Sequence, residues 1–386
     1  MAAKDKDRNK EASGRRSRSG WGKFWRIAFV VFDVLMVCAL ALTGYAGYVS
    51  PLQHGGIWGV LPLGFTVVLL AAVIFFALQL FVYRPGAAVL FAGFMLCAGP
   101  ILDNCPFNFG SLKIPEGAES FTLMSYNVHN FGLDDGSANP DTTSNPQIDY
   151  ILRQNADIVC LQEAADIFRQ STRLSWSQRK RLSEAYPEIS FDGTELVVLS
   201  KYPLKSVHLD ATRANFAGGH ASCYHVTLPS SRILTLFNVH LQSLSLVEAD
   251  RDVFMELTEL KRPKATQVKN QLFDKAAEAA VTRARQARQL MRYIRLYGGP
   301  DAILTGDFND VPGCYTIRTL EDAGFRDTYP SVGFGPMITF NSTRLYFCID
   351  HTMYRGALVP VDLRRGKTRA SDHYPLVSTF YIDKDK

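Results

Sequence analysis

The segment LTGDFNDVPG, residues 304–313, combines a short apolar run with side chains that could do chemistry. Ile303 and Leu304 are typical of the end of a buried strand, and a turn follows them directly. Asp307 and Asn309 stand two residues apart, so their side chains point the same way wherever the extended geometry persists. Two oxygen-bearing groups on one face could bind a cation, orient a water or cap the next helix. The segment alone leaves these three uses open.

Polar groups of the same kinds follow most of the other strand-like segments. They are carboxylates, amides and imidazoles, and each comes where an apolar run ends. The residues are Asn127 in MSYNVHNF, Glu163 in IVCLQEA, His240 in LFNVHLQS, Asp350 in FCIDHTMY, and Asp372 and His373 in RASDHYPLV. Because active sites gather at strand ends and loops on one side of a rigid sheet, the pattern predicts one shared site.

Taken in order, the motifs YNV, LQE, NVHL, GDFND, IDH and SDH resemble those of the endonuclease/exonuclease/phosphatase superfamily. That superfamily includes deoxyribonucleases, apurinic endonucleases, neutral sphingomyelinases and inositol polyphosphate 5-phosphatases. The resemblance covers about residues 120–382, and LSKYP at 199–203 also matches a family segment. That segment usually begins with Gly-Asn, where this chain has Gly193-Thr194-Glu195. The resemblance implies an α+β fold in which a two-sheet β-sandwich is flanked by helices, giving four layers.

A phosphoester hydrolase must neutralise an anionic phosphate, align and deprotonate a water, and stabilise the leaving oxygen. Mg²⁺ suits the first and third tasks because it takes hard oxygen ligands, often only one or two carboxylates, and keeps several waters. We expect Glu163 to bind Mg²⁺, with Asp372 and the amide of Asn127 as partners and Mn²⁺ as the alternative ion. Zinc is disfavoured because the cluster lacks Cys and is rich in carboxylates and amides.

The other strand-end residues have expected roles around the metal. His373 could take a proton from the attacking water or stabilise the phosphate oxygens, with Asp350 holding its ring. Asp307 would orient or deprotonate the water, and Asn309 would bond a phosphate oxygen. His240 would donate to the phosphate or protonate the leaving group. The sequence leaves open which of Asp307 and His373 is the general base.

Short strands and a few helices must position these residues. Strands are predicted at 121–128, 157–163, 196–200, 223–228, 232–241, 302–308, 345–354 and 376–382, and helices at 148–154 and 265–297. The longer helix carries an apolar stripe and five arginines, which we interpret as a solvated face. These arginines are Arg283, Arg285, Arg288, Arg292 and Arg295.

The first hundred residues differ from this pattern. Residues 1–26 hold nine Lys/Arg against three Asp/Glu, which is typical of a disordered basic tail. Three apolar runs follow at about 27–49, 57–83 and 86–102, and a linker at 103–119 leads to the catalytic domain, residues 120–386. A membrane-crossing helix needs about 20 apolar residues, so the first two runs qualify and the third is marginal. We expect three transmembrane helices.

The basic tail predicts a cytoplasmic N-terminus. Three crossings then place the catalytic domain outside the cytoplasm, as in an integral plasma membrane protein with a periplasmic domain. If the third run only re-enters the membrane, the domain lies inside instead. Asp33, in the first run, is expected near the headgroups or paired within the helix bundle.

The net charge of +5 comes from residues 1–110, because residues 111–386 contain 32 Lys/Arg and 32 Asp/Glu. A domain that grips long nucleic acid usually has a basic footprint. Neutrality therefore favours a small or membrane-borne phosphate ester, such as a lipid headgroup, a nucleotide or a sugar phosphate. The alternative is an extracytoplasmic nuclease, for which residues 169–181 offer five basic side chains and Trp176. A third hypothesis, a non-catalytic membrane scaffold, is disfavoured because every central residue is present.

Overall fold

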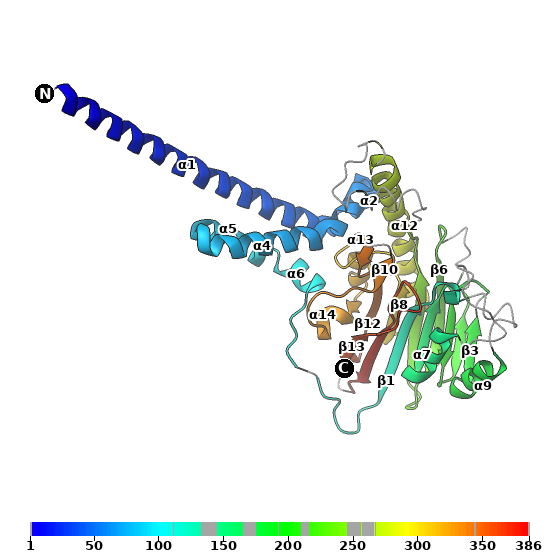
Figure 1. Ribbon diagram of the computed structural model, residues 1–386. Coiled ribbons are helices and arrows are strands. Elements are labelled where there is room, and N and C mark those ends of the chain that lie inside the picture. Colours follow the sequence, from blue (N-terminus) through cyan, green and yellow to red (C-terminus); the bar gives the residue numbers. More distant parts are fainter. Residues whose placement is uncertain are drawn as a thin grey trace. The chain divides into compact units, whose positions relative to one another are not determined.

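The chain divides into two compact units (Figure 1). The computed structural model describes residues 2–110, 112–132, 145–164, 175–191, 193–209, 216–244, 256, 266, 268–342 and 345–384. The first unit comprises Met1–Tyr45 and Leu63–Ile101, and the second comprises Ala46–Pro62 and Leu102–Lys386. The connection between the first two apolar runs therefore belongs to the same unit as the catalytic domain.

The membrane region holds two helices that are long and apolar enough to cross a bilayer, at Lys23–Tyr48 and Ile57–Val82. The expected third transmembrane helix is instead a pair, α5 (Arg84–Leu96) and α6 (Ala98–Asn104), bent by 71°. Pro100 explains the break, because a proline ring clashes with the carbonyl four residues earlier and supplies no N–H. The helix accordingly ends at Leu96, and the three transmembrane helices predicted from the sequence become two candidate spans and a bent pair.

Helix α1 (Ala2–Tyr45) also includes the basic tail, for which we expected no regular structure. The tail holds three Ala, four Lys and five Arg, which have high helix propensity, and it extends a helix that the apolar run has already nucleated. Within the first unit, Gln79 Nε2 of α4 (Phe65–Val82) donates a 2.5 Å hydrogen bond to Asp33 Oδ1. Asp33 is fully buried, so the expected pairing within the bundle is confirmed.

Two six-stranded sheets form the centre of the second unit. The first has the order β13 (Leu358–Arg365), β14 (Leu376–Ile382), β1 (Ser120–Asn127), β2 (Ile158–Gln162), β4 (Val197–Ser200) and β3 (Glu188–Phe191). The second has the order β5 (Leu204–Val207), β6 (His220–Thr227), β7 (Ile233–His240), β8 (Ala302–Asp307), β12 (Asp350–Arg355) and β9 (Arg326–Asp327). Each sheet has one central parallel pair, β1 with β2 and β7 with β8, between antiparallel neighbours. The carboxyl ends of each parallel pair therefore meet at one edge.

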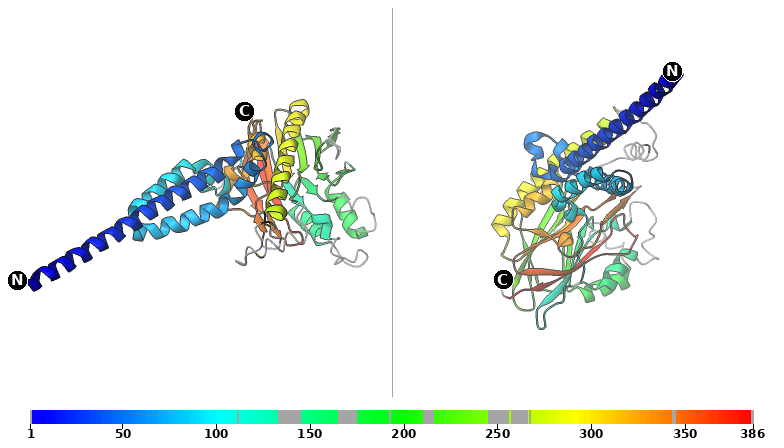
Figure 2. Two further views of the ribbon diagram at one scale, coloured as in Figure 1. Left: turned by 90° about the horizontal axis from the view of Figure 1, so that it is seen from above. Right: turned by 90° about the vertical axis from the view of Figure 1, so that its left-hand side faces the viewer.

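The two sheets pack face to face with helices on both outer faces, which confirms the four-layer sandwich (Figures 1 and 2). Between the sheets, apolar side chains such as Leu123 and Ile158 meet Leu236 and Ile303. Outside the first sheet lie α7 (Pro146–Gln154) and α9 (Trp176–Ala185), and outside the second lie α12 (Asp274–Tyr297) and α13 (Tyr315–Glu321). The remaining short elements are α2 (Pro51–His54), α3 (Ile57–Val60), α14 (Thr328–Val332), and a hairpin of β10 (Phe340–Ser342) with β11 (Leu345–Phe347).

Each predicted strand corresponds to an observed one, although the run 345–354 divides into β11 and β12. Strand β13 was missed because Pro360 lies inside it. Proline cannot donate to a sheet ladder and is confined to edges and bulges. Strand β13 is an edge strand, and its pairing with β14 shifts register between Pro360 and Asp362.

Candidate active site

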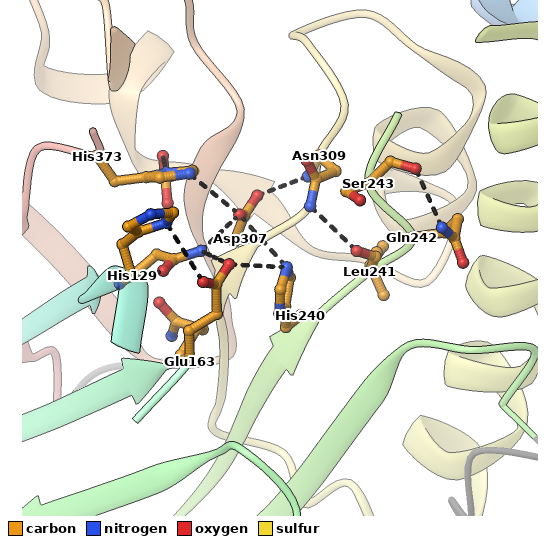
Figure 3. A network of polar contacts seen from close by, with 12 residues as sticks. His129, Glu163, His240, Leu241, Gln242, Ser243, Asp307, Asn309 and His373 are labelled. Atoms are coloured by element: carbon orange, nitrogen blue, oxygen red, sulfur yellow. Dashed lines mark hydrogen bonds and ion pairs between the residues drawn. The ribbon is translucent and has the colours of Figure 1, made fainter. Parts of the chain in front are cut away.

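The strand-end residues meet where the edges of the two sheets face each other (Figure 3). Asn127 ends β1 and Glu163 follows β2, while His240 and Asp307 end the neighbouring strands β7 and β8 in register. Asp350, at the start of β12, pairs with Asp307 across the antiparallel ladder. Asp372 and His373 lie in the segment before β14. The topology thus brings all the predicted site residues to one place.

Asp307 is the centre of the buried part of the site, with 1% of its surface exposed. Its Oδ2 accepts a 3.0 Å hydrogen bond from Asn127 Nδ2 and lies 3.5 Å from His373 Nε2 and 3.7 Å from His240 Nε2. Its Oδ1 accepts a 2.8 Å hydrogen bond from the backbone N–H of Asn309. One carboxylate is therefore flanked by two imidazoles and fixed by two hydrogen bonds.

Each of the two imidazoles has its own carboxylate partner. His373 Nδ1 lies 2.9 Å from Asp350 Oδ2, as the sequence predicted, and both side chains are buried. Burial by itself lowers the pKa of His373, but Asp350 and Asp307 outweigh that effect and raise the pKa to about 10. Burial raises the pKa of Asp350, and the neighbouring imidazole opposes that change.

Glu195 is the partner of His240, and the sequence did not identify it. His240 Nδ1 hydrogen-bonds Glu195 Oε1. Burial lowers the pKa of His240, but Glu195 and Asp307 raise it overall to about 9. Glu195 ends the stretch Gly193-Thr194-Glu195, which stands where the family usually has Gly-Asn, and it lies two positions before β4 begins at Val197. A search for a further carboxylate beside a buried strand would have found it.

The site has two parts. The floor is the buried part, formed by His240, Asp307, Asp350 and His373, and the rim is the more open part, formed by His129, Glu163 and Asp372. The side chains of Glu163 and Asp372 are 23% and 24% exposed, and each places a carboxylate oxygen 3.6 Å from His129 Nδ1. Glu163 has a backbone φ of 53° and His129 one of 45°, a left-handed conformation that costs roughly 1–2 kcal/mol for such residues. Backbone strain of this kind concentrates at functional sites. Two carboxylates, one after β2 and one in the segment before β14, thus converge on one point.

The rim fits a hard divalent cation better than the floor does. Glu163 and Asp372 supply two convergent carboxylates with access to water, which is the donor set that Mg²⁺ prefers. The buried group of Asp307, Asp350 and His373 also has ligand atoms within 4.8 Å of one another. In this buried group, however, the imidazole of His373 already places a positive charge beside both carboxylates.

Asn127 and Asn309 are oriented differently from the roles expected of them. Asn127 Nδ2 donates to Glu163 Oε1 at 2.9 Å and to Asp307 Oδ2, while its Oδ1 accepts from the backbone N–H of His129. The amide therefore links a rim carboxylate to the floor. Asn309 Nδ2 donates to the carbonyl of Leu241 at 3.1 Å. The predicted metal-ligand role of Asn127 and phosphate-binding role of Asn309 stay predictions.

A polar bridge between the sheets lies directly behind the site. Gln162 Nε2 donates a 2.7 Å hydrogen bond to Asn238 Oδ1, and Asn238 Nδ2 donates to the carbonyl of Leu161. Both bridging side chains are fully buried. Gln162 precedes Glu163, and Asn238 lies two residues before His240, so the bridge fixes the spacing of the two sheets where they carry the site.

Two buried ion pairs support the loop that follows Asp307. Arg283 of α12 lies 3.2 Å from Asp310, and His351 Nδ1 lies 2.6 Å from Asp327 Oδ2. His351 Nε2 also contacts the backbone carbonyl of Asp310 at 3.0 Å. The interpretation of the α12 arginines as a solvated face is therefore wrong for Arg283, which is fully buried. In the sequence, Arg283 lies within the helical pattern of α12, and nothing in that pattern indicates that its partner lies on the loop after Asp307.

Solved structures resemble the fold at low sequence identity. The human Nocturnin catalytic domain with bound sulfate has a TM-score of 0.46 and 17% identity, covering 71% of this chain and 96% of its own. A humanised D. rerio TDP2 has a TM-score of 0.42 and 16% identity, covering 68% and 98%. ANGEL2, a 2',3'-cyclic phosphatase, has a TM-score of 0.41 and 14% identity, covering 71% and 100%. No curated protein sequence matches the chain.

The model of the Endonuclease/Exonuclease/phosphatase family matches residues 124–373, which is more than half of the chain. The match begins in β1, three residues before Asn127, and ends at His373, so it contains every site residue described above. Members of this superfamily are hydrolases that act on phosphate esters. The chain belongs to the Endonuclease/Exonuclease/phosphatase family.

Proposed function

We propose that the chain is a membrane-anchored, Mg²⁺-dependent phosphoesterase, either a phosphodiesterase or a phosphatase. The observation that carries this proposal is the arrangement around Asp307. A buried carboxylate is flanked by two acid-paired imidazoles, and two further carboxylates converge beside it on an open rim. Hydrolysis of a phosphate ester needs both parts: donors and an acceptor for protons, and a site for a cation.

Glu163 and Asp372 would hold the cation, and Asn127 would orient Glu163 through its 2.9 Å hydrogen bond. A bound Mg²⁺, or Mn²⁺ as the alternative, supplies positive charge that neutralises the phosphate and stabilises the leaving oxygen. His129 lies between the two carboxylates, so it would contact the phosphate beside the cation.

Three side chains of the floor, His240, Asp307 and His373, would bind the phosphate and transfer the protons. Each imidazole has carboxylates facing both of its ring nitrogens, so each is arranged to donate hydrogen bonds from both. Donation suits His373 to binding phosphate oxygens and His240 to protonating the leaving oxygen. Asp307 then acts as the acceptor that orients the attacking water and takes its proton. This arrangement favours Asp307 over His373 as general base.

Chain connectivity supports a periplasmic catalytic domain. The connection Ala46–Pro62 belongs to the same compact unit as the catalytic domain, so both lie on one side of a membrane that α1 and α4 cross. For the chain to return to that side after α4, the bent pair α5–α6 must cross. With the basic tail in the cytoplasm, that side is the periplasm. Protease added to intact spheroplasts should remove the catalytic domain, and protection of the domain would contradict this topology.

The substrate class is tested with the full-length chain, because a fragment that begins after residue 102 loses the connection at 46–62. Purified protein in neutral detergent is given Mg²⁺ and assayed on plasmid DNA, sphingomyelin and a panel of phosphate monoesters. EDTA and the Asp307→Ala variant are the controls. Cleavage of lipid or small phosphates alone supports the proposal.

Nicking of plasmid DNA would favour the alternative, an extracytoplasmic nuclease. The feature relevant to that reading is α9, where Trp176 is 76% exposed and Lys180 Nζ lies 5.4 Å from its ring centre. Residues 169–174, which carry the other basic side chains of that stretch before α9, lie outside the described residues. Activity on none of the three substrates would favour the third hypothesis, a non-catalytic membrane scaffold.

A further inference from the structure

The connection Ala46–Pro62, which comprises the last residues of the first span, the first residues of the second and the residues between them, is packed onto the catalytic domain at backbone distance. A Cβ added to Gly47 would lie 1.8 Å from the carbonyl oxygen of Gly313, at the end of the GDFNDVPG loop. A Cβ added to Gly59 would lie 2.4 Å from Cβ of Ala280 on α12. Contacts this close leave no room for any side chain larger than hydrogen, so the connection is fixed against α12 and α13.

This packing determines which surface of the domain adjoins the membrane. The first candidate span ends at Tyr48 and the second begins at Ile57, so only residues 49–56 separate them. A segment that joins the ends of two crossing helices lies within a few residues of the hydrocarbon core. With the membrane crossing proposed above, the parts of α12 and α13 that contact this connection would lie in the headgroup layer.

A cavity of about 370 Å³ opens at this position. Its lining combines residues of the connection with residues of α12, α13 and the turn after α13. The lining residues that carry charge or a phenol are Tyr48, Arg288, Arg295, Tyr315, Arg318 and Asp322. Three arginines against one exposed aspartate make the cavity positive.

Two of the three arginines are available for a ligand. Arg318 is paired with Asp103 and, at 2.7 Å, with Glu321. Arg288 and Arg295 are exposed and form no ion pair with any carboxylate in the described part of the chain. Seven residues apart, they lie on the same side of α12, two turns from each other.

Hydroxyl groups surround one of these arginines. Arg288 Nη2 lies 3.4 Å from Ser50 Oγ and 3.4 Å from the Tyr315 hydroxyl. Guanidinium and hydroxyl donors that converge from separate elements are the groups with which proteins bind phosphate.

We propose that this cavity binds the phosphate of an anionic membrane phospholipid, with Arg288 and Arg295 as its charged ligands. Lipid is favoured over a free phosphate ion because the cavity adjoins the headgroup layer, where anionic lipids attract juxtamembrane Lys and Arg. The site rests on the membrane anchoring proposed above and is independent of hydrolysis. It gives two of the solvated arginines of α12, Arg288 and Arg295, a specific use.

The test is native mass spectrometry of the full-length chain in neutral detergent, titrated with phosphatidylglycerol. The Arg288→Gln/Arg295→Gln double variant should bind the first lipid at least about tenfold more weakly, the scale of one lost charge-assisted hydrogen bond. Arg292→Gln is the matched control, because it removes a positive charge from an exposed position of the same helix that does not line the cavity. Arg288→Lys/Arg295→Lys should restore part of the affinity.

Three outcomes would overturn the proposal. The double variant could bind phosphatidylglycerol as the wild type does. Arg292→Gln could weaken binding equally, which would mean diffuse attraction to a basic helix. Inorganic phosphate could displace the lipid at equal concentration, which would identify a free anion as the ligand. Carbonate extraction of native membranes tests the anchoring separately, and thermal unfolding of each variant shows whether it folds.

Discussion

The floor and the rim of the active site contain the same types of side chain in opposite electrostatic states. On the floor, Asp307 and Asp350 are buried, and the imidazole of His373 lies within hydrogen-bonding or ion-pair distance of both carboxylates. On the rim, Glu163 and Asp372 are about one-quarter exposed and share only the half-exposed His129. The buried carboxylates of the floor therefore have buried imidazole partners, whereas the two rim carboxylates converge beside one half-exposed imidazole and leave negative charge that a cation would balance. In the proposed function, proton transfer therefore belongs to the floor and cation binding to the rim.

Glu163→Gln should have the largest effect. It removes one of the two convergent carboxylates while keeping the size of the side chain and a hydrogen-bonding group for Asn127. Hydrolysis should fall further than the roughly 10²–10⁴-fold that one general acid or base contributes. The measurement is turnover against Mg²⁺ concentration, together with thermal unfolding to show that the fold is intact. Full activity with unchanged Mg²⁺ dependence would remove Glu163 from the metal site.

Asp350→Asn should have the next largest effect, and one of a different kind. The amide cannot hold His373 in the same protonation state, because it replaces an acceptor that carries a full negative charge. We expect turnover to fall on the order of 10²–10⁴-fold. The Mg²⁺ concentration for half-maximal rate should stay near the wild-type value, since Asp350 lies on the floor. A large shift in that concentration would mean that the buried carboxylates also hold the cation.

Glu195→Gln should reduce turnover less, by about 10–100-fold, the usual cost of losing a group that orients an active residue. Glu195 acts on the reaction through His240, and its side chain is 28% exposed, so water can replace part of the interaction. The control is Glu188→Gln, which changes a glutamate on the edge strand β3. Equal losses for Glu195→Gln and Asp350→Asn would show that the two imidazoles have equivalent roles.

The sequence predicted the floor and the rim because their residues follow strands whose apolar pattern is strong. Asn127, Glu163, His240 and Asp307 each come where a buried run ends, and parallel pairing brings such ends together. The sandwich itself was inferred from the order of the motifs, since apolar runs show that strands are buried but do not show which strands pair.

The residues that could not be identified from the sequence contact partners that lie far away along the chain. Glu195 reaches His240 over 45 positions, and Gln162 reaches Asn238 over 76. A helical position such as that of Arg283 has a periodicity but no indication of which loop it faces. The break at Pro100 is a different kind of omission, because a proline inside an apolar run is a local signal that composition alone does not weigh.

The smallest effect on turnover is expected for His351→Gln, which changes a pair behind the site. Burial lowers the pKa of His351, but the Asp327 carboxylate at 2.6 Å, with help from Asp350, raises it overall. A raised pKa in the folded state stabilises the fold fully below the unfolded value of about 6.5, and this stabilisation is lost as pH rises through the folded value. The free energy of unfolding should therefore differ most between wild type and variant at low pH, by about 3–5 kcal/mol, the cost of breaking a buried pair.

Thermal unfolding of both proteins in neutral detergent from pH 6 to 9 measures this difference. His240 and His373 also have raised pKa values, to about 9 and about 10, and their contributions cancel when the variant is subtracted from the wild type. His225→Gln is the control, because His225 of β6 forms no ion pair with any described residue. A difference that shrinks as pH rises means that the loop after Asp307 is held by an ionic pair. A difference independent of pH would mean a neutral hydrogen bond, and the residues behind the site would then lack the ionic pairing found on the floor.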